Sequence, residues 1–323
     1  MYSVLSLGCL LLSSTEVYGD QAYVANLSGN TVSVIHVPDN TPVATIPIGM
    51  SPSSVAVSPD GKFLYVTGNI SSGTISVVDT TTYAVVGSVN VGGSSALAMT
   101  PDGKTIYAPN LSHHSISVID TTSNSVTATI PAGSAPGFAV VSPDGSHVYV
   151  SDLFDNNVSV IDTLTNTVTA TIPVGFTPKG IAITPDGTLA YVANSNSRAL
   201  STNQSSVSIV DLSSNTVVGS LPIQPQPLNI AITPDGQQIY VVNKKIDNSG
   251  QLLVLDAGTY TELATVNVGS NPDIVAITGD GLLAYVTNSG DSTISVVDTS
   301  THTVVDTLST DAYPRGIVIS PTP

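Results

Sequence analysis

The sequence is dominated by a phrase that returns at nearly constant intervals. "SPDGKFLYVTGN", at residues 58–69, recurs as "TPDGKTIYAPN", "SPDGSHVYVSD", "TPDGTLAYVAN", "TPDGQQIYVVN" and "TGDGLLAYVTN". A repeat of this length is typical of solenoids, propellers and other arrays of one supersecondary unit. Aligned on their shared aspartate, the copies lie 42, 42, 42, 49 and 45 residues apart, at Asp60, Asp102, Asp144, Asp186, Asp235 and Asp280.

Each repeat contains four short strand-like segments, which we call A to D in chain order. Strand A, for example Lys179–Thr184, ends at a Pro-Asp-Gly turn, where proline presets φ and glycine accepts the left-handed conformation. Strand B follows with "LAYVAN", strand C is exemplified by Thr74–Asp79, and strand D by Thr167–Gly175. The nearly continuous apolar pattern of strand A predicts burial on both faces. Four antiparallel strands without a helical segment predict one propeller blade per repeat.

The two ends of the chain complete the count of blades. The repeats begin with a strand B at Gln21–Asn26 and finish with a strand A at Pro314–Ser320. We therefore expect the C-terminal strand to complete the first blade, so that no open edge remains between the first and last blades. The sequence predicts an all-β, seven-bladed β-propeller with four antiparallel strands per blade.

The repeated motifs also resemble those of a known family. "YVAN", "YVVN" and "YVTN", preceded by "PDG" or "GDG" in three of their four occurrences and followed by segments such as "VSVID" and "IPVG", are similar to the YVTN-type β-propeller repeats of surface-layer and secreted prokaryotic proteins. The resemblance covers residues 20–320. It implies the propeller fold, but the family's members include surface proteins, binding proteins and chains compared with lactonases, so it implies no single activity.

Charge and the N-terminal segment constrain the protein's surroundings. The net charge is −16, from seven Lys and Arg against 23 Asp and Glu, which disfavours nucleic acid as a partner because neutralising phosphates requires cations. Residues 1–19 contain the apolar run "VLSLGCLLLSS", which predicts a signal peptide or other leader. No Lys or Arg precedes the run, so a disordered leader or an extra strand are the alternatives, and "SLGC" around Cys9 loosely resembles a lipoprotein cleavage box.

Residues 20–323 are then expected to form a single propeller. No later stretch reaches the ~18 unbroken apolar residues that a membrane-spanning helix requires. These features together predict a secreted, periplasmic or cell-surface protein.

Most of the carboxylates recur in every repeat, which indicates a structural role. Aspartate in a turn accepts hydrogen bonds from nearby backbone amides, and its loss costs about 0.5–2 kcal/mol. We give the same interpretation to the repeated Tyr and Asn of strand B. The aspartates that close the C strands are Asp79, Asp120, Asp162, Asp211, Asp256 and Asp298.

The cations do not follow the repeat, and they predict a ligand site. We call the side that carries the D–A and B–C loops the top face. Lys62 and Lys104 belong to turns on the bottom face, whereas the other five of the seven cations belong to the top. Lys179 and Arg315 each follow the proline that opens strand A, and Arg198, Lys244 and Lys245 lie in the two longest B–C segments, residues 194–206 and 243–251.

The residues that follow the opening of strand A are expected to surround the mouth of the central channel. In blade order they are Ser53, Ser95, Gly137, Lys179, Leu228, Asp273 and Arg315, with Phe138, Phe176, Gln226, Asn229 and Tyr313 close by. A rim of polar, aromatic and cationic side chains around a concave opening is typical of a binding site.

Motifs for cofactors are missing from the sequence. It contains no CxxCH, Gly-rich phosphate loop, HExxH or GxSxG, and we predict no cofactor. Asp152 and Asp155 in "DLFDNN" offer oxygen ligands for calcium, but without EF-hand spacing. The adjacent His113 and His114 are candidates for a metal pair. For all four residues the alternative is an ordinary solvated loop.

Three functions fit these observations. The first is a secreted or cell-surface module, binding or structural and without enzymatic activity, whose top face takes an extracellular protein, a glycan or a small anionic ligand. The second is a lactonase-like hydrolase or a lyase at the channel mouth, with Asp273 as the candidate catalytic acid of the ring. The third is a packing unit of a surface lattice.

Overall fold

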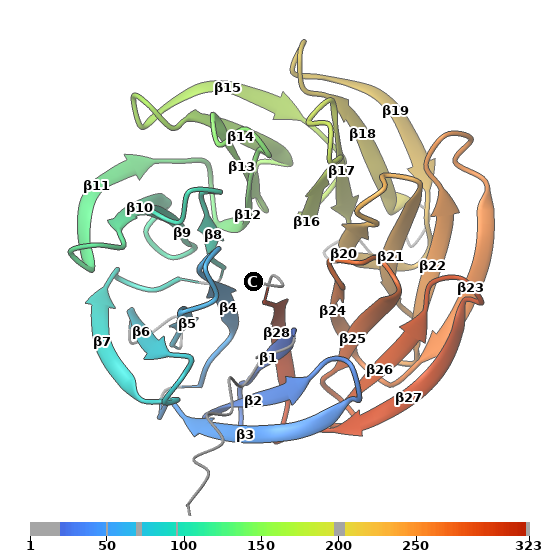
Figure 1. Ribbon diagram of the computed structural model, residues 1–323. Coiled ribbons are helices and arrows are strands. Elements are labelled where there is room, and N and C mark those ends of the chain that lie inside the picture. Colours follow the sequence, from blue (N-terminus) through green and yellow to red (C-terminus); the bar gives the residue numbers. More distant parts are fainter. Residues whose placement is uncertain (1–19, 50, 69–72, 95, 197–203, 321–323) are drawn as a thin grey trace, which may run out of the picture.

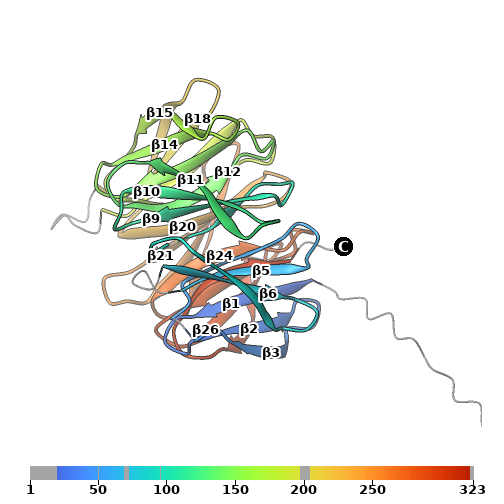
Figure 2. The ribbon, with the colours of Figure 1, turned by 90° about the vertical axis from the view of Figure 1, so that its left-hand side faces the viewer.

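A computed structural model describes residues 20–49, 51–68, 73–94, 96–196 and 204–320, and shows seven four-stranded sheets arranged around a central axis (Figure 1). The predicted all-β seven-bladed propeller is confirmed. Viewed from the side, the strand ends and their loops gather on two opposite faces of the ring (Figure 2). No helix among the described residues is long and apolar enough to cross a membrane. The predicted leader with Cys9, the ring residue Ser95 and the cation Arg198 lie outside the described residues.

The strands of the first four blades follow the predicted order A to D. The first blade holds β28 (Pro314–Ile319), β1 (Gln21–Asn26), β2 (Thr31–His36) and β3 (Thr41–Pro47). The second holds β4 (Ser54–Val57), β5 (Phe63–Thr67), β6 (Thr74–Asp79) and β7 (Val85–Asn90), and the third holds β8 (Ala98–Met99), β9 (Thr105–Asn110), β10 (Ser115–Asp120) and β11 (Ser125–Pro131). The fourth holds β12 (Pro136–Val141), β13 (His147–Asp152), β14 (Asn157–Asp162) and β15 (Thr167–Pro173).

The remaining three blades repeat the same plan. The fifth holds β16 (Pro178–Ile183), β17 (Leu189–Asn194), β18 (Ser206–Asp211) and β19 (Thr216–Pro222). The sixth holds β20 (Gln226–Ile232), β21 (Gln238–Lys244), β22 (Gly250–Asp256) and β23 (Glu262–Val268), and the seventh holds β24 (Pro272–Ile277), β25 (Leu283–Asn288), β26 (Thr293–Asp298) and β27 (Thr303–Ser309).

The ring closes by pairing its two ends, as predicted. Strand β28 is antiparallel to β1, with Ala22 opposite Ile319 and Val24 opposite Ile317. The two strands lie side by side at the axis in Figure 1. A four-stranded first blade results, and its inner edge carries no unpaired strand.

The recurring phrase builds the turn between strands A and B. Ser58 Oγ donates to Asp60 Oδ1 at 2.6 Å and accepts from the Phe63 amide at 3.0 Å, while Asp60 Oδ1 also accepts from the Lys62 amide. Gly61 takes a φ of 70°, which glycine adopts without steric cost. Equivalent carboxylate bonds recur in the other five copies of the phrase. These aspartates hold their own turns.

The repeated tyrosines join neighbouring blades. They lie in the apolar cores between sheets and are between 0 and 4% exposed. Tyr107 Oη donates to Asn166 Oδ1 of the next blade at 2.8 Å, and Tyr285 Oη donates to Asn40 Oδ1 at 2.6 Å across the ring closure. One residue type therefore fills the core between blades and fixes their spacing.

Strand A packs on both faces, as expected, but its burial is incomplete. In β12 the last four residues, Phe138–Val141, are only half-buried, and β24 and β28 contain half-buried positions as well. Ala139 and Val141 pack into the core between the third and fourth blades, and Val140 packs into the core between the fourth and fifth, so both faces of β12 contact neighbouring blades. The A strands are the innermost of each sheet and surround the channel, which leaves them partly exposed (Figure 1).

Candidate functional site

A β-bulge at the start of strand A places side chains at the channel mouth. In β16, Pro178 pairs with Asn194, but the next pair is Ile181 with Val192, so two residues of β16 oppose one of β17. The same shift occurs in β12, β24 and β28. A bulge re-aims the side chains next to it. In these four strands the bulge contains the residue after the proline, which is Gly137, Lys179, Asp273 or Arg315.

Hydroxyl groups on strand B satisfy the amides that two of these bulges release. Ser151 Oγ accepts from the Phe138 amide at 3.1 Å, and Thr287 Oγ1 accepts from the Ile274 amide at 3.1 Å. Thr287 Oγ1 also donates to the carbonyl of Arg315 at 2.8 Å, which ties the seventh blade to the first. The mouth therefore has a hydrogen-bonded backbone beneath it.

The two cations of the ring are each followed by a glycine. A Cβ on Gly180 would come within 2.7 Å of the Asn229 Cα, and one on Gly316 would come within 2.7 Å of the Ser54 Cα. Only glycine allows this approach of the next blade's inner strand. The backbone next to Lys179 and Arg315 is therefore packed tightly against the inner strand of the next blade.

The bulges surround a cavity of about 240 Å³ at the channel mouth. Six of the seven residues predicted for the ring line it together, and Ser95 lies outside the described residues. The lining residues are Ser53, Ser54, Leu111, Gly137, Phe138, Leu153, Lys179, Leu228, Asp273, Ile274 and Arg315.

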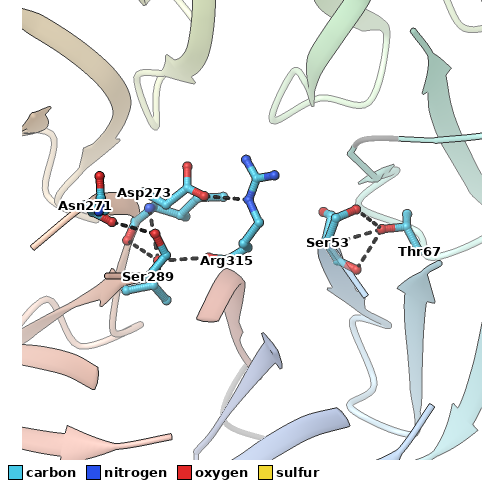
Figure 3. A network of polar contacts seen from close by, with 9 residues as sticks. Ser53, Thr67, Asn271, Asp273, Ser289 and Arg315 are labelled. Atoms are coloured by element: carbon cyan, nitrogen blue, oxygen red, sulfur yellow. Dashed lines mark hydrogen bonds and ion pairs between the residues drawn. The ribbon is translucent and has the colours of Figure 1, made fainter. Parts of the chain in front are cut away.

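An ion pair between neighbouring blades stands at one side of this cavity. Arg315 Nε donates to Asp273 Oδ2 at 2.7 Å (Figure 3). The pair is partly open to solvent, since the Arg315 and Asp273 side chains are 42% and 23% exposed. The charge of Asp273 raises the pKa of Arg315. Figure 3 shows the two terminal nitrogens of the guanidinium directed away from Asp273, and neither forms a hydrogen bond with another described residue.

Lys179 adds a second positive charge to the cavity wall. Burial lowers the pKa of this ammonium group, Asp273 raises it, and the positive charges of Arg315 and Lys244 lower it. Within the described ranges Lys179 forms no ion pair shorter than 4 Å. The cavity therefore combines two cations with one carboxylate that is already engaged.

The other residues predicted for the rim take different places. Phe138 lines the cavity. Asn229 is buried, and its Oδ1 accepts from the Val275 amide of the next blade at 3.2 Å, so it connects two blades rather than facing the cavity. The backbone amide of Gln226 donates to Asn243 Oδ1. Phe176 and Tyr313 are 48% and 42% exposed on top loops, outside the cavity lining.

The long segment at residues 243–251 is more ordered than a loop. Asn243 pairs with Gln251, and Lys244, the last residue of β21, pairs with Gly250, so the strands extend by two pairs into the segment. The Lys245 amide donates to the Ser249 carbonyl, closing a tight turn. Asp247 accepts from the amide and the hydroxyl of Ser249. Lys244 and Lys245 both lie outside the cavity lining.

The candidate metal ligands do not gather into one group. His114 Nδ1 accepts from the Ala135 amide at 2.9 Å, and the His113 ring lies near Gly92. Asp155 Oδ2 accepts from the Ser134 amide. The described part of the chain contains no cluster of three or more His, Cys, Asp or Glu that could hold a metal ion.

Asp152, which the sequence suggests only as a calcium ligand, is a buried carboxyl group. It is fully buried, Ser159 Oγ donates to its Oδ2 at 2.6 Å, and Oδ1 has no hydrogen-bond partner. Burial raises the pKa of this carboxyl to about 6. The signal that reveals it is the repeat itself, because "YVSD" ends in aspartate where "YVAN" and "YVTN" end in asparagine.

A larger cavity of about 730 Å³ lies on the bottom face, between the fourth and fifth blades. Its walls include Asp144, Asp186 and Asp211, and no Lys or Arg is among its described lining residues. Each of these carboxylates accepts hydrogen bonds within its own turn, which lowers its pKa. The groove is built from turn scaffolding, whereas the cavity at the channel mouth is lined by Lys179, Asp273 and Arg315.

Comparison with known proteins identifies the family. The family model described as "Choice-of-anchor I domain" matches residues 75–309, which is more than half of the chain. The chain belongs to the choice-of-anchor I domain family. This choice-of-anchor I chain is also 40% identical, over 75 residues, to a seven-bladed beta-propeller protein of Mycobacterium tuberculosis. That alignment spans 22% of the chain and 19% of the relative.

Solved structures share the fold of this choice-of-anchor I chain. Hydrazine synthase from Kuenenia stuttgartiensis matches with a TM-score of 0.76 and 23% identity, over 82% of this chain and 88% of the other. A proposed 6-phosphogluconolactonase from Bacteroides fragilis matches with a TM-score of 0.77 and 18% identity, over 95% and 99% of the two chains. At such identities the likeness shows the fold alone.

Proposed function

We propose that this choice-of-anchor I propeller is a secreted or cell-surface binding module that takes a small anionic ligand at its channel mouth without converting it. The observation that carries the proposal is that Lys179 and Arg315 both line one cavity, in a chain whose net charge is −16. A pocket with a few convergent polar groups is the usual place for a ligand. Family membership supports the surface role.

The number of cations favours a small ligand over nucleic acid. Two cations line the cavity, and one of them is paired with Asp273. Binding to a polyanion draws most of its affinity from many neutralised phosphates. The net negative charge of the protein would repel such a polyanion.

Binding without chemistry is favoured over a lactonase-like or lyase activity. General acid–base catalysis needs a positioned group that is available to transfer a proton. Asp273, the candidate catalytic acid, already accepts from Arg315 Nε, and no histidine is among the described residues of the cavity wall. The likeness to proposed 6-phosphogluconolactonases extends to the fold, not to a matching catalytic group.

A thermal-shift screen of residues 20–323 tests the proposal. The screen covers small carboxylates, phosphates, oligosaccharides and divalent metals, and each compound that binds is recovered and analysed by mass spectrometry for conversion. A ligand at 100 times its Kd should stabilise the protein by about 2.7 kcal/mol. We expect small anions to raise the melting temperature and to be recovered unchanged.

Two matched double variants are compared, one lacking two cations of the top face and the other lacking two cations of the bottom face. In Lys179→Ala/Arg315→Ala the stabilisation should disappear, whereas in Lys62→Ala/Lys104→Ala, which loses the same charge from exposed bottom turns, it should persist. An equal loss of stabilisation in both double variants would show that the effect depends only on net charge, and would contradict the proposal. Conversion of a ligand that stops in Asp273→Ala would instead support an enzyme.

A further inference from the structure

The cavity also indicates which class of anion it fits, an inference that rests on the proposed function. We propose that the ligand is a monocarboxylate with an apolar body, held at its carboxylate by Arg315 and Lys179 and covered elsewhere by aliphatic and aromatic side chains. Three features carry this assignment: the orientation of the guanidinium, the balance of charge and the composition of the walls.

The guanidinium is oriented before any ligand arrives. Its Nε is held by Asp273 Oδ2 at 2.7 Å, and the terminal nitrogens point away from that carboxylate (Figure 3). Arginine presents its donors in a planar fork that matches the two oxygens of a carboxylate. Because the side chain is already fixed by Asp273, little conformational entropy remains to be lost when the fork binds.

The balance of charge favours a single negative charge. Lys179 and Arg315 carry two positive charges, and Asp273 compensates one of them. A monocarboxylate would neutralise the remaining charge. A dianion such as a phosphate ester would leave one negative charge uncompensated in a partly desolvated site, which is costly.

The walls favour an apolar body over a sugar. Five of the eleven lining residues are large and apolar: Leu111, Phe138, Leu153, Leu228 and Ile274. The hydroxyl of Ser53 is engaged with Thr67 Oγ1 at 2.9 Å (Figure 3). A polyol would therefore lose its hydration at a surface with few groups to replace it, whereas an apolar body gains by burial.

Isothermal titration with matched probes tests the assignment. The probes are 3-phenylpropanoate, its neutral analogue 3-phenylpropanamide, acetate, gluconate and inorganic phosphate. We expect 3-phenylpropanoate to bind at least about tenfold more tightly than each of the others, because it alone combines a carboxylate with an apolar body. Acetate tests the apolar body and the amide tests the carboxylate, in each case without altering the protein.

Variants locate the contact. Arg315→Lys keeps the charge but removes the fork, and it should weaken 3-phenylpropanoate by about tenfold or more. Lys104→Ala, on the bottom face, should leave the affinity unchanged. Unfolding of each variant without ligand is measured alongside, so that a loss of affinity is compared only between proteins of equal stability.

The outcomes separate this inference from the proposed function. If gluconate or phosphate binds through Arg315 and 3-phenylpropanoate does not, the channel mouth is a ligand site but the assigned class is wrong. Binding of 3-phenylpropanoate that is equal in Arg315→Lys and Lys104→Ala, or equal to that of the amide, also overturns the assignment. If no compound of either experiment binds at the mouth, both proposals fail.

Discussion

Asp152 shows how one substitution in a repeat changes local chemistry. Its counterparts in five of the other six blades are Asn26, Asn110, Asn194, Asn243 and Asn288, and the second blade has Gly68. In four of these the side-chain amide donates to two hydroxyls of strand C, as Asn26 does to Thr31 and Ser33. An ionised Asp152 has no proton to donate and is fully buried, so its charge is stabilised mainly by the Ser159 hydroxyl.

We predict that Asp152→Asn raises the free energy of unfolding at pH 7.5 by about 1–3 kcal/mol. Burial raises the pKa of Asp152 in the folded protein to about 6, and one pKa unit corresponds to about 1.4 kcal/mol. Folding thus favours the protonated carboxyl, whose contribution to stability is full below about pH 4 and is lost as the pH rises through 6. The gain from asparagine should therefore shrink toward pH 4.

Urea unfolding at pH 4 and pH 7.5 measures this difference. Asp306→Asn, which removes a carboxylate from an exposed position on β27, is the control for charge alone. A stability of Asp152→Asn that is unchanged or lower at pH 7.5 would show that the buried carboxylate is satisfied by interactions other than the Ser159 bond.

At the scale of the element, the turns and the outer strands have separate roles. The pKa of every one of the twelve repeated turn aspartates is lowered, because hydroxyls and backbone amides donate to the ionised carboxylate, as Thr100 and the Lys104 amide do to Asp102.

Each outer strand D contains a β-bulge opposite strand C. Bulges discourage edge-to-edge pairing, which argues against lattice assembly by strand addition.

We predict that Asp102→Ala lowers the free energy of unfolding at pH 7 by about 0.5–2 kcal/mol, through loss of the turn's hydrogen bonds. Since the folded-state pKa of Asp102 is lowered, its contribution is present above the unfolded pKa near 4 and is lost as the pH falls further. Chemical denaturation of wild type and variant at pH 7 and pH 2.5 should show the gap closing. A gap of equal size at both pH values would mean that the ionised form makes no special contribution.

Across the whole molecule, charge is polarised along the channel axis. The twelve turn aspartates share the bottom face with Lys62 and Lys104, whereas Lys179, Lys244, Lys245 and Arg315 belong to the top. Surface potential raises the local concentration of oppositely charged ligands. An anion would consequently meet less repulsion at the top of the channel than at the bottom.

The sequence predicted the fold well because the repeat encodes it several times over. Each copy of the phrase carries its own turn chemistry, and the incomplete units at the two ends define the closure. The ring around the mouth was also predictable, since one position after proline recurs in every blade.

The finer geometry of the mouth could not be predicted in the same way. Asp273 and Arg315 lie 42 residues apart, and their ion pair depends on bulges that no sequence period reveals. The sequence predicts Asn229 at the rim, but in the shifted register of β20 its side chain accepts from the Val275 amide of the next blade. Half-burial of strand A follows from the channel, which is a property of the closed ring and not of any one repeat.

The central claim is that ligand recognition takes place at the channel mouth. A crystal structure of residues 20–323 grown with the tightest-binding compound of the two experiments tests it most directly. We predict ligand density between Arg315, Lys179 and Phe138, with a carboxylate on the terminal nitrogens of the guanidinium. Density in the 730 Å³ groove between the fourth and fifth blades, with an empty channel mouth, would contradict the claim.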